Sequence, residues 1–563
     1  MTWGKRRALV ILLVVAFIVV GVMIFTSSSR ISSKSVLVLD LNGDIPEQRP
    51  NDLFSAVGGN YIPVMHEVVD SIERAKTDPR ITGLVVKIGP LETGWAKLEE
   101  IHARILSFRE SHKPSVCYLE HDGVGNLEYY LASACDQVWL VPTNPVFVHG
   151  MMAQALFLRG TLDKLKIYPD MFHIADYKTA SNMLTEKKFT AAHREELDSL
   201  LHSIYDEYLT ETSQSRKLDR AGFETLVKQG PFLAQEALAN KLVDKLAYWD
   251  EVQGFFKQKN DEWKPVHLAR YRQEVKSGGV ETIAVIHATG LIVSGESGNS
   301  PAGGSIMGGD SVAADVRHAR ENSSVKAIVL RVDSGGGSAV ASEVIRREVM
   351  LARKEKPVVV SMSDVAASGG YWISMGANKI IAEPSTITAS IGVVEGKLNV
   401  SGFFNLLGLS TDYVATSENA TIFSSQQNFT PAQREAIQKS MQDIYDQFIH
   451  GVADGRKMTV EAVDKIGKGR VWTGAQGKTL GLVDELGGLD RAIEVAKQLA
   501  GIPAGKSVRI ERLPEEKSFF EILLSRDRSG ALSGFATLEQ KIRWIMRIAE
   551  PVQARMPFEL VIR

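Results

Sequence analysis

The sequence KAIVLRVDSGGGSA…EKPVVVSMSDVAASGGYWISMGANKIIAEP, from Lys326 to Pro384, decides the fold because it occurs twice. An earlier stretch, Thr82–Pro142, reads TGLVVKIGPLETGW…HKPSVCYLEHDGVGNLEYYLASACDQVWLVP and shares its apolar strand and helix patterns. The later copy contains Ser334–Gly337 (SGGG) and Ala367–Gly370 (ASGG), whereas the earlier copy has neither that serine nor those glycines. A duplication that keeps the fold but concentrates serine and glycine in one copy indicates that the site is retained there.

Each copy alternates short apolar runs with helical patterns. The expected strands lie at 35–41, 83–88 and 114–119 in the first copy, and at 282–286, 327–332 and 357–362 in the second. The expected helices lie at 64–75 and 97–111 in the first copy, and at 311–320 and 339–354 in the second. Strands that alternate with helices at this spacing predict an α/β protein built of βαβ units around a mostly parallel, buried sheet.

The match between the copies continues beyond these elements. Phe189-Thr190 corresponds to Phe429-Thr430, each opening a long amphipathic helical stretch, and Leu242–Asp244 corresponds to Leu482–Asp484. We therefore expect a first repeat domain over residues 30–275 and a second over 280–510. Residues 511–563 read as a polar, partly helical extension to which the pattern assigns no role.

Composition narrows the functional classes. The chain of 563 residues is 44% hydrophobic and 23% charged, which is typical of a multidomain globular protein. Lys and Arg total 65 against 67 Asp and Glu, so no basic excess points to nucleic acid as a partner. No His/Cys cluster has the spacing of metal ligands, and we expect neither a metal nor another cofactor.

The N-terminus has the pattern of a membrane anchor. Ala8–Phe25 is 18 residues long without a charge and follows Lys5–Arg7. This length just spans a bilayer, and the basic cluster keeps residues 1–7 in the cytoplasm. A cleaved signal peptide, cut near Ser27 or Ser29, is the alternative. We expect an uncleaved single-pass helix over residues 8–26, with the rest of the chain outside the cytoplasmic membrane of a bacterium.

Both cysteines, Cys117 and Cys135, lie in the first repeat. Their counterparts in the second repeat are the apolar residues Val360 and Ala377. We therefore expect two buried free thiols that act as small hydrophobic side chains, rather than a disulfide.

Two segments of the second repeat carry residues suited to catalysis. Ser368 lies between a strand and a helical segment, where a hydroxyl reaches the carboxyl edge of the sheet and the helix N-terminus favours a developing anion. Ser334–Gly337 directly follows another strand, and glycines let main-chain N–H groups face a ligand. An N-cap serine and a flexible turn are the structural alternatives.

A nucleophilic serine needs a base. His287, His318 and His450 stand in no partner motif and are expected to be scattered structural or surface residues. A lysine can serve if burial lowers its pKa, and Lys178 in Tyr177–Ala180 (YKTA) is the candidate. Its counterpart position falls near Glu418, so this lysine also occurs in one copy alone. Composition and spacing do not separate it from an ordinary exposed lysine.

Taken together, the motifs resemble those of signal peptide peptidase A (protease IV) in its long form, a family of membrane-anchored bacterial Ser-Lys proteases. The resemblance covers nearly all of residues 1–510. The motifs that carry it are Tyr177–Ala180, Ser334–Ser338, Met362–Trp372, Pro384–Gly392 and Val471–Gly488. It implies two tandem repeats of the ClpP/crotonase-like fold.

The resemblance also implies roles for single residues. Ser368 matches the family's nucleophile and Lys178 its general base, which places the two halves of one dyad in different repeats. Main-chain N–H groups of Gly337 and Gly369 match the oxyanion hole, with Gly336 the substitute, and Ser390 matches a partner of the lysine. The family loop often reads Asn-Ser-Pro-Gly-Gly-Ser, whereas this chain has Asp333 and Gly335 at the Asn and Pro positions.

The function implied is that of a periplasmic serine endopeptidase that degrades cleaved signal peptides and other unfolded hydrophobic peptides. The family further implies a bowl-shaped homotetramer. Two alternatives remain open at this point. A crotonase-like acyl-CoA enzyme uses a similar glycine-lined oxyanion hole, and a non-catalytic membrane scaffold could have inherited the same fold.

Overall fold

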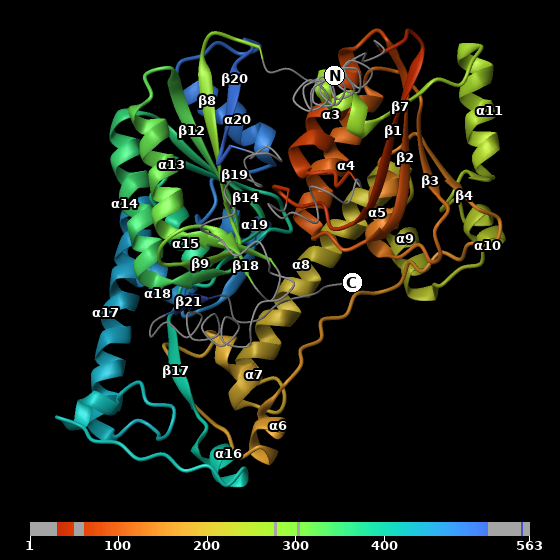
Figure 1. Cartoon of the computed structure of the whole chain (residues 1–563). Helices are drawn as coiled ribbons and strands as arrows, with labels where there is room; N and C mark the ends of the chain where they lie inside the picture. Colours follow the sequence, from red (N-terminus) through yellow and green to blue (C-terminus); the bar gives the residue numbers. More distant parts are fainter. Residues whose placement is uncertain (1–30, 50–60, 275–277, 301–303, 516–552, 556–563) are drawn as a thin grey trace, which may run out of the picture.

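The first half of the chain folds around a parallel sheet of six strands in the order β6-β4-β3-β2-β1-β7 (Figure 1). This sheet is seen in a computed structural model that describes residues 31–49, 61–274, 278–300, 304–515 and 553–555. Its strands are β1 (Ser35–Gly43), β2 (Ile81–Leu91), β3 (Ser115–Leu119), β4 (Gln137–Leu140), β6 (Lys245–Leu246) and β7 (Pro265–His267). Its central strands are buried nearly throughout, as expected of a sheet covered on both faces.

The second half repeats this architecture with an eight-stranded sheet. Six of its strands run in the order β18-β16-β14-β12-β8-β20, and β15 pairs with both β14 and β19. They are β8 (Thr282–Thr289), β12 (Val325–Ser334), β14 (Val358–Ala367), β15 (Lys379–Ala382), β16 (Ile387–Ala389), β18 (Val471–Thr473), β19 (Glu485–Leu486) and β20 (Arg509–Leu513). Apart from the antiparallel pair β16 and β18, these strands are parallel. The expected α/β fold with buried parallel strands is confirmed.

Equivalent helices pack on the two sheets. The first half has α3 (Met65–Thr77), α4 (Trp95–Arg109) and α5 (Asn126–Ser133), and the second has α13 (Gly309–Glu321), α14 (Ala339–Glu355) and α15 (Gly369–Ser374). Each sheet has a large apolar core on one face and a smaller one on the other. The helix ranges expected from the sequence agree with these bounds to within a few residues.

The duplication extends to individual hydrogen bonds. Helices α8 (Ala191–Arg216) and α17 (Pro431–Arg456) are both 26 residues long, and the side chains of Thr190 and Thr430 cap them in the same way. The hydroxyl of Tyr129 donates to the main-chain oxygen of Leu242 at 2.9 Å, and Tyr371 makes the same bond to Leu482 at 2.9 Å.

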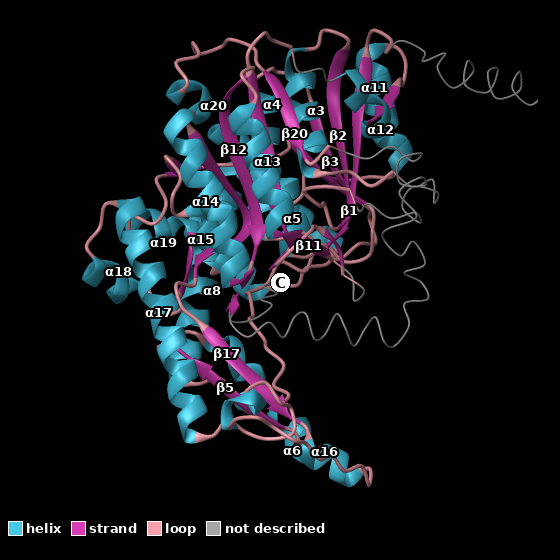
Figure 2. Cartoon of the chain, turned by 60° about the vertical axis from the view of Figure 1, so that its left-hand side comes forward, coloured by secondary structure: helices cyan, strands magenta, loops and turns pink. Residues whose placement is uncertain are grey.

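A third sheet joins the two halves. Its order is β10-β11-β9-β13-β21-β17-β5, and β5 (Tyr168–His173) from the first half pairs antiparallel with β17 (Val394–Asn399) from the second. The other strands are β9 (Leu291–Val293), β10 (Gly298–Asn299), β11 (Ser305–Gly308), β13 (Gly336–Ser338) and β21 (Gln553–Arg555). In Figure 2, β5 and β17 form an arm that projects away from the two main sheets, with α6 (Arg159–Lys164) and α16 (Ser401–Leu406) at its tip.

The two ends of the chain bear on two expectations. In the part of the chain that the structure describes, no helix is long and apolar enough to cross a membrane. The expected anchor over residues 8–26 lies outside the described residues. Strand β20 pairs with β8, so residues up to Leu513 belong to the second sheet rather than to a separate extension.

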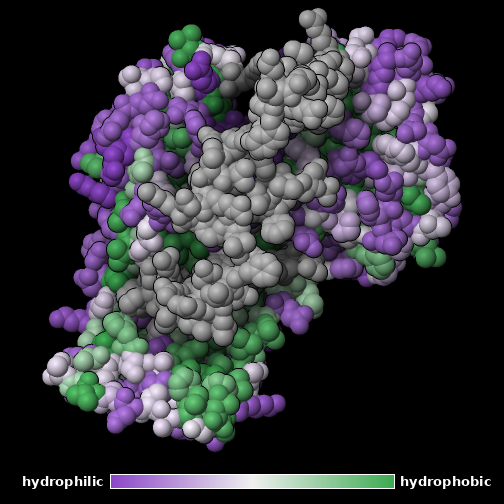
Figure 3. Space-filling view, in the orientation of Figure 1, coloured by the Kyte–Doolittle hydropathy of each residue, from purple (hydrophilic) through white to green (hydrophobic). Residues whose placement is uncertain are grey.

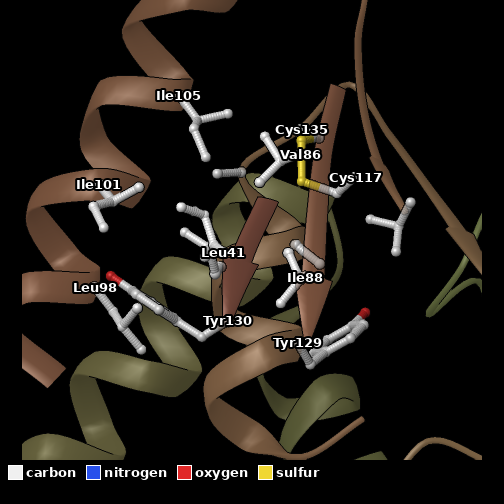
Figure 4. Packing of buried hydrophobic residues seen from close by; sticks show 14 of the residues in the cluster. Leu41, Val86, Ile88, Leu98, Ile101, Ile105, Cys117, Tyr129, Tyr130 and Cys135 are labelled. Atoms are coloured by element: carbon white, nitrogen blue, oxygen red, sulfur yellow. A yellow bond between two sulfur atoms is a disulfide. The ribbon is translucent and has the colours of Figure 1, made fainter. Parts of the chain in front are cut away.

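The expectation of two free cysteines is wrong, because Cys117 and Cys135 form a disulfide (Figure 4). Cys117 lies on β3, Cys135 lies two residues after the end of α5, and their Cα atoms are 5.7 Å apart, a separation that disulfides favour. Both residues are buried as expected, in the core that contains Val86 and Ile88. The comparison with Val360 and Ala377 failed because apolar counterparts in the other repeat do not show whether two thiols pair.

We predict that the double variant Cys117→Val/Cys135→Ala, which copies the second repeat, lowers the free energy of unfolding by about 3 kcal/mol. The bond closes a loop with a sequence separation of 18, and losing it gives the unfolded chain more conformations. Denaturant titration of both proteins under oxidising conditions measures the difference. In excess reductant the two curves should approach each other, and equal stability under oxidising conditions would contradict the prediction.

Candidate active site

The two sequence-predicted catalytic residues meet in the structure. Nζ of Lys178 lies 2.7 Å from Oγ of Ser368, although the residues are 190 positions apart. Both side chains are 0% exposed. Lys178 follows β5, whose pairing with β17 carries this part of the first repeat to the second, so the third sheet positions the lysine against the serine.

Ser368 lies at a sharp turn between β14 and α15. Its backbone has φ 56° and ψ −113°, a conformation rare for a residue with a side chain. Its N–H donates to the main-chain oxygen of Ala389 at 2.6 Å, which fixes the turn against β16. Strain of this kind is found where a fold holds a functional group in one orientation. Gly370 closes the turn, because a Cβ there would lie 2.5 Å from the main-chain oxygen of Ser334.

The amine of Lys178 is held by a second serine. Nζ donates to the main-chain oxygen and to Oγ of Ser390, both at 3.0 Å. The structure therefore contains the contact between Ser390 and the lysine that the family resemblance implies. With Ser368, these acceptors surround the amine and orient it toward the nucleophile.

Burial lowers the pKa of Lys178 to about 7, because the charged ammonium loses its hydration. A negative charge on Glu196 would act in the opposite direction. Burial also raises the pKa of Glu196 to about 8, although its Oε2 accepts a hydrogen bond from the N–H of Val471 at 3.0 Å. Glu196 is thus mostly neutral near pH 7 and leaves the lysine available as a base.

Two glycines pack against the lysine. Gly469 has φ 81°, and a Cβ there would lie 2.4 to 2.5 Å from the main-chain N, Cα and Cβ of Lys178. A Cβ on Gly392 would lie 3.1 Å from Cδ of the same lysine. Gly469 and Glu196 were missed from the sequence, and Gly392 was noticed only inside a longer motif. Their importance arises from contacts between segments far apart in the chain, which spacing does not reveal.

The glycine loop forms β13 and lies beside the nucleophile turn. Oγ of Ser334 accepts a bond from the N–H of Gly336 at 3.1 Å and donates to the main-chain oxygen of Gly290 at 2.6 Å. The N–H of Gly336 is therefore already engaged. Gly369 is the first residue of α15, so its N–H has no acceptor within the helix. This favours Gly369 as an oxyanion donor and counts against Gly336.

The three histidines set aside from the sequence lie elsewhere. His287 is buried with Nδ1 3.9 Å from a carboxylate oxygen of Glu47, His318 contacts Glu511, and His450 bonds to the main chain within its own helix. Within the described residues, no group of three His, Cys, Asp or Glu side chains is arranged to hold a metal ion.

A buried lysine amine that contacts a serine hydroxyl at a strand–helix turn, next to a glycine loop, is characteristic of serine hydrolases with a lysine base. The chain belongs to peptidase family S49, whose model matches residues 107–261 in the first repeat and 350–503 in the second. It is accordingly a serine protease.

Relatives match over nearly the whole chain. "Serine protease SPPA, chloroplastic" from Arabidopsis thaliana is 34% identical over 94% of this chain and 78% of its own length. "Protease 4" from Salmonella typhi is 33% identical over 99% of this chain and 91% of its own length. A "Putative signal peptide peptidase SppA" from Enterococcus faecium is 34% identical over 32% of this chain and 52% of its own.

Two solved structures resemble parts of the chain more remotely. A mutant ClpP1 from Listeria monocytogenes has a TM-score of 0.25 and 14% identity, covering 37% of this chain and 94% of its own. A membrane-bound stomatin-specific protease, solved with a substrate peptide, has a TM-score of 0.27 and 17% identity, and the match covers 44% of this chain and 98% of that protease.

We predict that Gly469→Ala lowers kcat about 100-fold, because its Cβ displaces the backbone of Lys178 and moves the amine from the serine. The matched control is Gly481→Ala, which has a similar φ of 78° but a nearest neighbour 3.9 Å from the added Cβ. Steady-state peptide cleavage by both variants separates the clash from backbone strain. If the two variants lose activity equally, the clash with Lys178 is not the cause.

Proposed function

We propose that Ser368 is the nucleophile and Lys178 the general base of a Ser-Lys endopeptidase. The observation that carries this proposal is the 2.7 Å contact between Nζ of Lys178 and Oγ of Ser368, both fully buried. A lysine can accept a proton only when neutral, and burial lowers its pKa to about 7.

The chemistry proceeds in two half-reactions. Neutral Lys178 takes the hydroxyl proton as Oγ of Ser368 attacks the peptide carbonyl carbon, and the N–H groups of Gly337 and Gly369 stabilise the oxyanion. The protonated lysine then gives its proton to the leaving amine, and an acyl-enzyme remains. Water attacks the acyl-enzyme with the same lysine as base, and collapse of the second tetrahedral intermediate releases the acid and restores Ser368.

The substrate binds as an extended strand beside the glycine loop. Strand β21 supports this, since it pairs antiparallel with β13 over Gly336–Ser338 and touches β17 at Val394. Strand β21 itself occupies the edge between β13 and β17, so this edge accepts main chain in β conformation, and a substrate strand would take the place of β21. Main-chain pairing at Gly337 would align the scissile carbonyl with the proposed oxyanion donors.

We propose that the substrates are cleaved signal peptides and other unfolded hydrophobic peptides. A relative named as a signal peptide peptidase supports this class. The arm of β5 and β17 also presents an apolar surface, green at the lower end of Figure 3. Its exposed large apolar side chains include Leu398, Leu406, Leu407, Leu409, Tyr413, Val414 and Phe423. A contiguous apolar surface on a soluble domain is typical of an interaction site.

We further propose that this arm contributes to a homotetramer, and that residues 8–26 anchor the protein in the bacterial inner membrane with its active site in the periplasm. The disulfide between Cys117 and Cys135 supports an oxidising compartment. The family resemblance supports both the oligomer and the anchor.

The two other functions considered from the sequence have no specific observation in their favour. A crotonase-like acyl-CoA enzyme has no use for a lysine directed at a serine, and family membership supports the peptidase. A scaffold would gain nothing from a fully buried lysine with a lowered pKa, because that burial destabilises the fold. A catalytic role explains why this arrangement is retained.

We predict that a peptide aldehyde or a serine-directed phosphonate modifies Ser368, since Lys178 makes its hydroxyl nucleophilic. Mass spectrometry of the intact labelled protein measures the adduct. Labelling should be abolished in Ser368→Ala and reduced at least about 100-fold in Lys178→Met. The control is Ser374→Ala, a buried serine of α15 that donates to the main-chain oxygen of Gly370. Peptide cleavage that survives in both dyad variants would refute the assignment.

We predict that kcat/KM rises with pH through a midpoint near the Lys178 pKa of about 7, as the amine loses its proton. In Glu196→Gln the midpoint should shift little, because Glu196 is already mostly neutral at that pH. Initial rates at constant ionic strength give both profiles. Activity that falls as pH rises across this range would contradict a lysine base.

A further inference from the structure

Lys97 is a buried cation in an electrostatically unfavourable place. It lies in the first turn of α4, where the helix dipole disfavours positive charge, and it is 6% exposed. The equivalent position in α14, counted from the helix start, is the buried Ala341. Neither helix packing nor the repeated fold therefore requires a lysine here.

Two carboxylates of the second repeat account for this lysine. Nζ of Lys97 lies 3.0 Å from Oδ2 of Asp333 and 3.4 Å from Oδ2 of Asp364. Burial alone would lower the pKa of Lys97, but these carboxylates raise it well above its ordinary value, so the amine is charged. A single cation from one repeat thus holds two anions of the other close together.

Both carboxylates lie just before the proposed catalytic groups. Asp333 is four residues before Gly337 near the end of β12, and Asp364 is four residues before Ser368 on β14. Oδ1 of Asp333 also accepts a hydrogen bond from the N–H of Val365 at 3.2 Å, which links β12 directly to β14. Lys97 therefore bridges the two strand segments that lead into the glycine loop and the nucleophile turn.

Each of the two aspartates makes a further contact, Asp333 through its main chain and Asp364 through its side chain. The main-chain oxygen of Asp333 accepts a hydrogen bond from the N–H of Gly290 at 2.9 Å. The main-chain oxygen of Gly290 in turn accepts a hydrogen bond from the hydroxyl of Ser334, which also contacts the glycine loop. Oδ1 of Asp364 accepts the N–H of Lys97 at 3.0 Å and caps α4 across the repeat interface. Gly94 leaves room for this cap, because a Cβ there would lie 2.3 to 2.5 Å from the carboxylate.

We propose that Lys97 is a positioning residue for the peptidase reaction, acting through Asp333 and Asp364 to hold the glycine loop and the nucleophile turn at the separation that the oxyanion requires. This inference rests on the proposed function of Ser368 and Lys178. Lys97 itself touches neither of these residues in the described contacts and takes no part in proton transfer. Without its charge, the two carboxylates repel each other and the strand ends separate.

The test compares Lys97→Met with the unaltered full-length protein. We expect kcat for peptide cleavage to fall about 10–100-fold with KM within about twofold, because the misplaced donors act on the transition state. Affinity for a peptide boronate, whose adduct places an oxygen in the oxyanion hole, should fall in proportion to kcat/KM. Binding of an uncleaved peptide in the Ser368→Ala background should not change.

Rescue distinguishes a charge effect from lost packing. Lys97→Met/Asp333→Asn removes the repulsion and restores the Asn common in related loops, so it should recover about tenfold of the lost kcat. Lys87→Met, which breaks an ion pair with Glu120 inside the first repeat, is the control and should retain full activity. If Lys97→Met does not fold, Gly94→Ala displaces Asp364 without removing any charge and should lower kcat with KM retained.

The inference is overturned if folded Lys97→Met keeps kcat within about twofold, or if kcat, peptide binding and thermal stability fall together with no rescue by Asp333→Asn. The same assays on Ser368→Ala and Lys178→Met test the underlying function separately. If those two variants still cleave peptide, the proposed dyad is wrong. If they are inactive while Lys97→Met is fully active, only the positioning role is wrong.

Discussion

The structure depends on one contact, the meeting of the Lys178 amine with the Ser368 hydroxyl in a site without exposure to water. An ammonium in such a site is unfavourable, so the pKa of the lysine falls to about 7 and the neutral amine that catalysis needs is populated near neutral pH. The same burial keeps bulk water away from the base. The segments that surround Lys178 must therefore stay packed around it, because its burial is what lowers its pKa.

Ion pairs as well as apolar contacts hold the two repeats together around this site. Lys97 and Glu100 are three residues apart on α4 and therefore lie on one face of the helix. Arg331 and Asp333 are two residues apart on β12 and therefore lie on one face of the strand. Lys97 pairs with Asp333, and Glu100 pairs with Arg331 at 2.8 Å. Breaking one partner of such a buried pair is strongly destabilising, so the pattern fixes how the two repeats dock.

The sequence predicted the elements well because hydrophobic periodicity is local. The parallel strands, the paired long helices and the serine turn all follow from patterns within one repeat. The proximity of Lys178 to Ser368 came from family resemblance, since spacing left that lysine indistinguishable from others. Gly469 and Lys97 were missed because their partners belong to distant segments. The disulfide was mispredicted because two apolar counterparts in the other repeat carry no information about whether thiols pair.

The two repeats have become chemically complementary while their folds stayed alike. In the second repeat, the counterpart region of Lys178 contains η3 (Glu418–Thr421), a largely exposed turn without a lysine. In the first repeat, the counterpart of the nucleophile turn reads Gly125-Asn126 and lacks the serine. If each repeat had kept a complete set, two sites would compete for the same interface. Because the first repeat supplies the lysine and the second supplies the serine turn, the chain has one such site at the interface. The ion pairs between α4 and β12 then stabilise one arrangement of the two repeats.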